Sequence, residues 1–295
     1  MDQAERLRNM IKEQKASKNT DSNGARVITI TSGKGGVGKS STAVNLAVQF
    51  RKLGYRVVIL DADFGMANIE VMFGAIPKFN LSDVIYRGKS LEDIVVEGPM
   101  GVKFISGGSG VFEMTDMSSD NLRYLTAKLN ELETMTDIII IDTGAGVSER
   151  VLQFVTTCNE VLLITTPEPT SITDSYALLK ALNRHPDYDK DNTVVKIITN
   201  RVSNEEEGKT LFSKLSIVVN KFLQIELKHL GMIPQDAHIL KSVMQQQPVS
   251  IAYENSGASK AYEVIAKRLT QNENEKVSEK RGISFMFAKM FKSKT

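Results

Sequence analysis

One motif constrains this 295-residue chain more than any other feature: Gly33-Lys34-Gly35-Gly36-Val37-Gly38-Lys39-Ser40. It fits the pattern G-x-x-x-x-G-K-S/T and lies between an apolar run, Val27–Ile30, and a helical pattern that begins at Ser41. Glycines allow the backbone to fold back and aim N–H groups at a phosphate, and the helix adds its positive dipole end. The motif therefore predicts a phosphate-binding loop, in which Lys39 contacts the β- and γ-phosphates, Ser40 serves Mg²⁺ and Ser41 adds a nucleotide contact.

Short apolar runs alternate with helical patterns through most of the chain. The run Ile138–Ile141 is continuously apolar, as expected of a parallel strand that helices cover on both faces. The predicted fold class is therefore α/β, with one doubly wound, mostly parallel sheet. The other expected strands are Val57–Leu60, Phe104–Ile105, Val161–Thr165, Val194–Thr199 and Leu227–Ile233.

The chain divides into three parts by composition. Small and polar residues at 15–25 and 271–282 indicate linkers, and no such linker interrupts residues 26–270. We therefore expect an N-terminal helix and linker (1–25), one catalytic domain (26–270) and a C-terminal linker and helix (271–295). The formal net charge is +2, with the positive excess at the two ends, so nucleic-acid binding is not indicated.

Cysteine content and hydropathy limit the cellular setting. The single cysteine, Cys158, forms no internal disulfide and is expected to be a buried structural thiol in a reducing cytoplasm. The first residues lack the apolar core of a secretory signal. No apolar stretch reaches the ~20 residues that span a bilayer, so any contact with a membrane is expected to be peripheral.

Lys34 places a second cation beside the phosphate loop. From the residues alone, it could stay solvated or reach a phosphate. The loop resembles the deviant Walker A motif of the MinD/ParA family of P-loop ATPases, and the resemblance covers roughly residues 26–270. It implies ATP and Mg²⁺ as ligands, hydrolysis of ATP, and an ATP-dependent homodimer in which Lys34 reaches the partner's phosphates and acts at the transition state.

Carboxylates follow two of the expected strands, Asp61 and Asp63 after Val57–Leu60 and Asp142 after Ile138–Ile141. Asp after a strand is also common in turns and helix caps, but the carboxyl ends of parallel strands face the ligand crevice. The resemblance implies that Asp63 serves the metal site and activates the attacking water, that Asp61 supports the first switch loop and that Asp142 reaches Mg²⁺ through water. Gly146 would belong to the second switch loop.

The family resemblance also extends to the base of the nucleotide. It implies an adenine-contacting turn at Asn200 and Arg201, and it places Glu168 in a segment that meets the partner subunit and its nucleotide. The second adenine wall would lie in the segment 231–236, which ends at Asp236, with Ile233, Pro234 and Gln235 as its nucleotide contacts. From the residues alone, Pro234 could simply mark a loop.

The C-terminal segment predicts an amphipathic helix. At ~100° per residue its large apolar side chains fall within an arc of ~140°, and its lysines lie opposite. The apolar residues are Ile283, Met286, Phe287, Met290 and Phe291, and the lysines are Lys289 and Lys292. This pattern favours binding to an anionic membrane surface, on the inner face of the cell membrane; the alternative is a helix that docks on its own domain.

The N-terminal segment contains the sequence DQAERLR at positions 2–8. Its thin apolar stripe is typical of a frayed terminal helix, but the sequence resembles the activator motif of the FlhG (YlxH/FleN) group of MinD-like ATPases. The resemblance implies control of flagellar number and placement, with stimulation of the GTPase FlhF through Gln3. Flagellar switch-complex proteins are further candidate partners.

Three other functions remain open at this point. A division-site MinD would share the loop and the tail but not the DQAERLR segment. A DNA-segregating ParA would need basic phosphate contacts, whereas residues 26–270 carry a small acidic excess. A metabolite kinase or synthetase would have little use for either terminal helix, and an iron protein of this branch would need paired cysteines.

Overall fold

A computed structural model describes residues 24–63, 68–107, 119–271 and 282–292. Within them, eight strands form one sheet in the order β3-β4-β2-β5-β1-β6-β7-β8. All neighbours are parallel except β3 and β4, which are antiparallel. The strands are β1 (Arg26–Ser32), β2 (Val57–Ala62), β3 (Val96–Glu97), β4 (Lys103–Ser106), β5 (Ile138–Ala145), β6 (Glu160–Thr165), β7 (Val194–Val202) and β8 (Leu227–Pro234).

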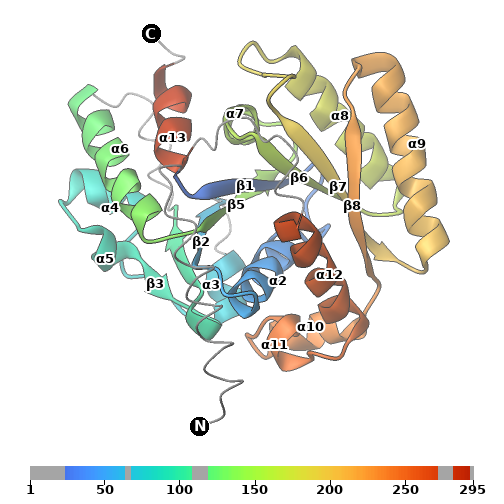
Figure 1. Cartoon of the computed structure of the whole chain (residues 1–295), viewed down its shortest axis with the longest axis horizontal. Coiled ribbons are helices and arrows are strands. Elements are labelled where there is room, and N and C mark those ends of the chain that lie inside the picture. Colours follow the sequence, from blue (N-terminus) through green and yellow to red (C-terminus); the bar gives the residue numbers. More distant parts are fainter. Residues whose placement is uncertain (1–23, 64–67, 108–118, 272–281, 293–295) are drawn as a thin grey trace.

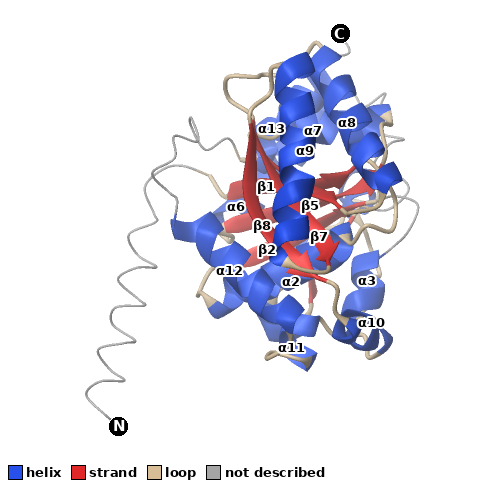
Figure 2. Ribbon diagram, turned by 90° about the vertical axis from the view of Figure 1, so that its right-hand side faces the viewer, coloured by secondary structure: helices blue, strands red, loops and turns tan. Residues whose placement is uncertain are grey.

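Helices cover both faces of the sheet (Figures 1 and 2). One face packs against α2 (Lys39–Lys52), α3 (Asn68–Phe73), α10 (Ala237–Met244), α11 (Val249–Ala252) and α12 (Gly257–Gln271). The other packs against α4 (Leu81–Tyr86), α5 (Leu91–Ile94), α6 (Ser119–Thr134), α7 (Glu149–Thr157), α8 (Pro169–Arg184), α9 (Glu205–Leu223) and α13 (Ile283–Lys292). Alternate residues of β5 enter opposite cores, Ile140 one and Ile139 the other, because successive side chains point to opposite faces.

The predicted fold class, one doubly wound, mostly parallel sheet, is confirmed. The expected strands all lie within observed strands. The sequence did not predict β3 or the helices α3, α4, α5, α10 and α11, which have two to eight residues each. Such short elements span too few residues for an apolar period to emerge.

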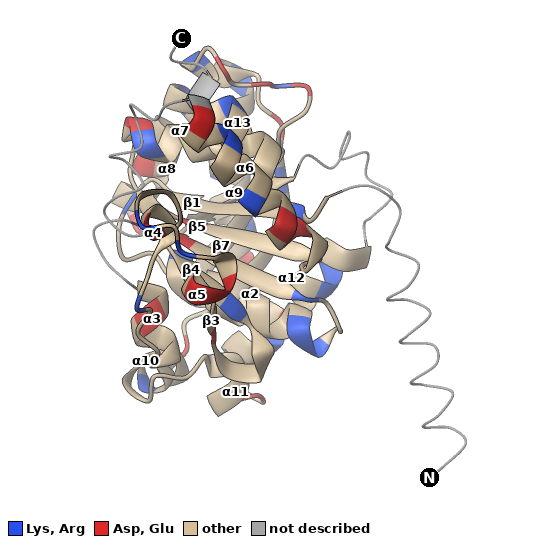
Figure 3. Cartoon of the chain, turned by 90° about the vertical axis from the view of Figure 1, so that its left-hand side faces the viewer, with Lys and Arg blue, Asp and Glu red and all other residues tan. Residues whose placement is uncertain are grey.

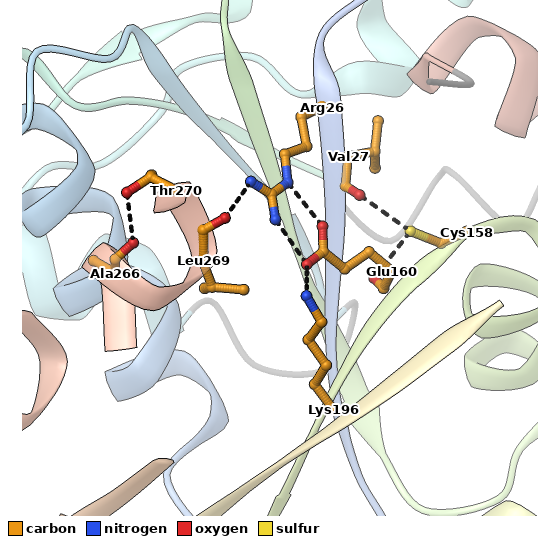
Figure 4. A network of polar contacts seen from close by, with 8 residues as sticks. All are labelled: Arg26, Val27, Cys158, Glu160, Lys196, Ala266, Leu269 and Thr270. Atoms are coloured by element: carbon orange, nitrogen blue, oxygen red, sulfur yellow. Dashed lines mark hydrogen bonds and ion pairs between the residues drawn. The ribbon is translucent and has the colours of Figure 1, made fainter. Parts of the chain in front are cut away.

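The amino-terminal ends of the central strands are joined by a buried ionic network (Figure 4). Arg26 of β1 makes two 2.8 Å contacts to the Glu160 carboxylate of β6, and Lys196 of β7 donates to the same carboxylate over 3.0 Å. Arg26 also donates to the Leu269 carbonyl near the end of α12, over 2.7 Å. One carboxylate therefore connects three neighbouring strands, and one guanidinium connects the sheet to the last helix of residues 26–270.

The C-terminal helix α13 lies against α6 and α7 (Figures 1 and 3). The four predicted lipid-facing residues Ile283, Met286, Phe287 and Met290 are at most 4% exposed and belong to a core cluster of the domain. Of the two predicted outward-facing lysines, Lys289 donates instead to the carbonyls of Thr156 and Asp187. The structure thus has the docked arrangement that the sequence left as the alternative, because the apolar face finds a complementary apolar groove on its own domain.

Two sets of predicted residues fall outside this description. Gln3 and the DQAERLR segment precede the described residues. At the other end, the side chains of Phe291 and Lys292 are also outside the description. Among the described residues, no helix is both long and apolar enough to cross a bilayer.

Candidate nucleotide site

The phosphate loop connects β1 to α2 at the carboxyl edge of the sheet, where β1 lies between β5 and β6. Gly36 and Gly38 have φ values of 75° and 99°, which only glycine adopts without strain. A Cβ on Gly33 would lie 2.1 Å from the backbone carbon of Asp174, so α8 packs directly against the loop. These three glycines are therefore required by backbone geometry, and the predicted strand-loop-helix context is confirmed.

A cavity of about 650 Å³ opens at this loop. The phosphate-loop residues Gly35, Gly36, Gly38 and Lys39 line it, together with Ser40 and Ser41. The predicted base-contacting residues Asn200, Arg201 and Gln235 line it as well. Of the remaining predicted residues, Val37 and Ile233 are buried in the core. The volume lies within the range of small-molecule sites.

Two carboxylates lie side by side near the carboxyl ends of neighbouring strands, since Asp61 of β2 pairs in register with Asp142 of β5. Both oxygens of Asp142 are buried and make no hydrogen bond of normal geometry within the described residues. Burial raises the pKa of Asp142 to about 6, against the opposing effects of the Ser40 hydroxyl and the Lys39 ammonium. A buried carboxylate whose oxygens lack a well-formed hydrogen bond among the described residues fits a site that receives a hydrated cation.

Asp61 organises the chain that leaves β2. Its carboxylate accepts from the backbone N–H of Asp63 over 3.1 Å and from that of Ile69 over 3.4 Å. Burial and the neighbouring charge of Asp142 raise the pKa of Asp61 to about 8. Asp63 itself lines the cavity, and a Cβ on Gly144 of β5 would lie 3.6 Å from its Oδ1 atom. The two predicted switch segments thus meet beside the phosphate loop.

The raised pKa of Asp61 predicts an unusual pH dependence of stability. The native state holds a proton that the unfolded state loses near pH 4, so the free energy of unfolding falls as the pH rises toward about 8. Between pH 6 and 8, the loss from this group is at most ~1.4 kcal/mol per pH unit. Urea unfolding without nucleotide or Mg²⁺ measures it, and Asp61→Asn should remove most of the fall. An identical pH profile in the variant would contradict the assignment.

The second lysine of the loop is held within the chain. Lys34 Nζ lies 2.9 Å from Glu168 Oε2 and 2.8 Å from Thr170 Oγ1, both at the start of α8. The two charged side chains remain 37% and 52% exposed, and the Lys34 hydrogen bond lowers the pKa of Glu168. The sequence left open whether Lys34 is solvated or bound to a phosphate. In the structure its ammonium is in a solvent-accessible ion pair beside the cavity.

Asn200 and Arg201 contact the phosphate loop directly. The Asn200 amide donates to the Val37 carbonyl over 2.7 Å, and the Arg201 guanidinium donates to the Gly36 carbonyl over the same distance. The amide nitrogen predicted to face a purine is therefore engaged with the loop in this structure. The adenine contact stays a prediction.

The cavity is also lined by Asp236, which lies in the segment expected to form the second adenine wall, and by side chains that were not predicted. Asp236 accepts from the backbone N–H groups of His238 and Ala258, and so ties the starts of α10 and α12 together. The side chains of Met72, Leu240 and Val243 form an apolar part of the cavity wall. Asp236 stands directly before α10, and its residue type is one that indicates a helix N-cap. Nothing in the local sequence indicates that α3 and α10 face the cavity.

Comparison with known proteins identifies the family. A family model described as ParA, an NUBPL iron-transfer P-loop NTPase, matches residues 23–270. The chain belongs to the MinD/ParA family of P-loop NTPases. Within this family it is 40% identical over 244 residues to the antiactivator FleN of Pseudomonas aeruginosa, covering 83% of this chain and 86% of FleN. It is 32% identical over 250 residues to the flagellum site-determining protein YlxH of Helicobacter pylori, covering 84% and 82%.

These two relatives confirm the resemblance to the FlhG (YlxH/FleN) group of this family. Among solved structures, MinD of Pyrococcus furiosus matches with a TM-score of 0.65 at 23% identity, covering 84% of this chain and 99% of that one. MinD of Pyrococcus horikoshii, solved with Mg-ADP, matches with the same TM-score and identity and covers 86% and 99%. At this identity the structural likeness confirms the fold.

Proposed function

We propose that this chain is an ATP-dependent, dimerising ATPase that associates with the inner face of the cell membrane and regulates flagellar number and placement. The observation that carries the proposal is Lys34, a partly exposed second lysine beside the phosphate-loop cavity, whose ammonium contacts Glu168 and Thr170 within the described residues. The relatives FleN and YlxH, an antiactivator and a flagellum site-determining protein, support the flagellar role.

The cavity supplies the parts that phosphoryl transfer to water needs. Lys39 and the backbone N–H groups of the loop would hold the β- and γ-phosphates, and Asp63 would orient the attacking water. Ser40 and, through water, Asp142 would hold Mg²⁺. The buried carboxylate of Asp142, which makes no hydrogen bond of normal geometry in the described part of the chain, fits that role. When bound, the ion neutralises charge on the phosphates.

The Lys34–Glu168 pair suits a cation that must change partner. Exposed ion pairs contribute little to stability, typically ~1 kcal/mol or less. A triphosphate on a second subunit would attract the Lys34 ammonium more strongly than one carboxylate does. We infer that Lys34 leaves Glu168 when two ATP-loaded copies meet, and then stabilises the charge that develops on the partner's γ-phosphate.

The C-terminal helix α13, here called the tail, would exchange between a position docked on its own domain and a position on the membrane. Its apolar face is covered by the domain in this structure, so the same face meets lipid only after α13 undocks. One freed tail would bind a membrane weakly, whereas two tails on one dimer raise the avidity by ~10²-fold or more. Dimerisation with ATP would thereby become attachment to an anionic membrane.

This coupling predicts a nucleotide effect on membrane binding. Flotation with vesicles that contain anionic lipid should recover the chain with ATP at least ~10-fold more than with ADP, because only the dimer presents two tails. Phe287→Asp should abolish flotation with both nucleotides. Equal recovery with ATP and with ADP would contradict the coupling.

The DQAERLR segment is proposed to act on FlhF. The Gln3 amide would orient the attacking water in the partner's active site, as glutamine does in other GTPases. Gln3→Ala should therefore lose most of the stimulation of FlhF GTP hydrolysis, measured as phosphate release, while ATP hydrolysis by this chain is unchanged. Gln14→Ala is the matched control, and full stimulation by Gln3→Ala would refute the assignment.

A further inference from the structure

A second, smaller cavity of about 190 Å³ adjoins the nucleotide cavity. Asp63 and Ala145 line both cavities, so the two meet at the predicted catalytic carboxylate. The other residues that line the small cavity come from the ends of β2 and β5 and from the start of α7. They are Ala62, Gly144, Ser148, Arg150, Val151 and Phe154.

The small cavity extends from solvent to the protein interior. Ser148 and Arg150 are exposed, whereas Val151 and Phe154 are at most 4% exposed. Water occupies a cavity that offers it both room and polar partners, and each molecule takes up ~30 Å³ in the liquid. The small cavity has room for several waters, and Asp63, Ser148 and Arg150 supply polar side chains. Its chemistry therefore fits water as the occupant.

Gly144 leaves a gap between Asp63 and the start of α7. An added Cβ at this position would lie 3.6 Å from Asp63 Oδ1 and 3.8 Å from Val151 Cγ2, both of which are ordinary contact distances. Gly144 is not among the glycines with positive φ, so its backbone would also accept an alanine. Unlike Gly36 and Gly38, it is not required by backbone geometry. What its missing side chain does is keep the passage beside Asp63 open.

The buried wall of the small cavity is fixed by α7 and by the docked helix α13. Ser148 Oγ caps α7 by accepting from the Val151 N–H over 3.4 Å. The Phe154 ring meets the Phe287 ring of α13 edge to face, with centroids 6.2 Å apart. Glu133 of α6 holds α13 in turn, since its Oε1 accepts from the Ser284 N–H over 2.8 Å. Val151 and Phe154 therefore have defined positions beside the passage.

We propose that the small cavity supplies the attacking water to the nucleotide site. The proposal rests on the proposed function, in which a second copy covers the nucleotide cavity and Asp63 orients the water. Once two copies have closed over ATP, water no longer enters through the covered face, whereas the small cavity still reaches Asp63 from the side of α7.

The step that this water serves is the hydrolysis of ATP. The water oxygen forms a bond to the γ-phosphorus while the bond from that phosphorus to the bridging oxygen of ADP breaks. ADP leaves with the bonding electron pair. One proton of the water stays on the inorganic phosphate, and the other passes through the Asp63 carboxylate to solvent.

The test is the rate of ATP hydrolysis in a series of side chains at position 151. Val151→Ile and Val151→Phe place progressively more volume in the small cavity. We expect kcat to fall stepwise, by about tenfold or more for Val151→Phe, because fewer waters reach the attacking position. The KM for ATP should change by less than about twofold, since Val151 is not among the described residues that line the nucleotide cavity. Steady-state phosphate release measures both constants.

Two further variants distinguish a water route from a merely structural role. Val151→Ala enlarges the cavity, so it should keep kcat although it lowers stability; a fall as large as that of Val151→Phe would overturn the proposal. Val155→Ile makes the change of Val151→Ile one turn along α7, at a buried position outside the described lining of the small cavity, and should keep kcat. Equal losses from these two isoleucine variants would also overturn it.

A third variant narrows the passage without altering α7. Gly144→Ala should lower kcat several-fold by placing a methyl group between Asp63 and Val151. This variant and Val151→Ile decide the question if binding of a fluorescent ATP analogue shows that Val151→Phe is unfolded. Normal hydrolysis by all the enlarged variants that fold would overturn the proposal.

Light scattering with ATP separates failure of the water route from failure of the proposed function. Val151→Phe should form the same ATP-dependent dimer as the unaltered chain. A variant that dimerises and also hydrolyses ATP at the normal rate would refute the water route and leave the proposed function standing. An unaltered chain that hydrolyses ATP as a monomer would refute the proposed function, and the series at position 151 would still test the route. A chain without ATP hydrolysis would overturn both.

Discussion

Replacing Lys34 with alanine should lower the rate of ATP hydrolysis by about 10³-fold or more, which is the effect of removing a cation supplied in trans to a phosphoryl-transfer site. The Lys34 ammonium contacts Glu168 and Thr170 of the described chain, and the replacement leaves the Lys34 carbonyl, which accepts from the Ser32 hydroxyl, in place. ATP binding by the monomer should therefore be nearly unchanged. Steady-state phosphate release and binding of a fluorescent ATP analogue measure the two effects separately.

Two further variants serve as controls for Lys34→Ala. Lys39→Ala should lose nucleotide binding as well as turnover, because Lys39 is buried in the loop at the start of α2. Lys209→Ala, an exposed lysine of α9, should change neither. Normal hydrolysis by Lys34→Ala would show that this lysine takes no part in the chemistry.

Replacing Glu160 with glutamine should lower the free energy of unfolding by about 3–5 kcal/mol. Although burial by itself raises the pKa of Glu160, the charge and hydrogen bonds of Arg26 and then Lys196 lower it overall. Without the carboxylate, the buried Lys196 ammonium and the Arg26 guanidinium lose the charge that they share. The midpoint of urea unfolding near pH 7 measures the loss.

The matched control for Glu160 is Glu254→Gln, in an exposed ion pair with Lys52, which should cost less than ~1 kcal/mol. Because the native pKa of Glu160 is lowered, its contribution is present above about pH 4.5 and disappears as the pH falls below that value. The two variants should therefore converge in acid. A loss from Glu160→Gln no larger than that from Glu254→Gln would contradict the role of the network.

The phosphate loop and the sheet could be predicted because both depend on local sequence. Gly36 and Gly38 adopt positive φ values, and Ile138–Ile141 is buried on both faces, so residue type alone carries the signal. The carboxylates Asp61 and Asp142 could also be placed, since the ends of parallel strands converge on one edge.

Contacts between distant segments could not be predicted from the sequence. The pairing of Lys34 with Glu168 depends on how closely α8 approaches the loop, at Gly33. An amphipathic helix presents the same pattern to lipid and to an apolar groove, so α13 alone does not reveal which one it contacts. The deciding features are Glu133 and Phe154, which lie more than a hundred residues away along the chain.

The central claim is that ATP joins two copies through Lys34. Light scattering coupled to size exclusion measures it most directly, using Asp63→Ala to slow hydrolysis. The account predicts a dimer with ATP, a monomer with ADP, and a monomer with both nucleotides once Lys34→Ala is added. The same mass with ATP and with ADP, or an ATP-dependent dimer that survives the loss of Lys34, would contradict it.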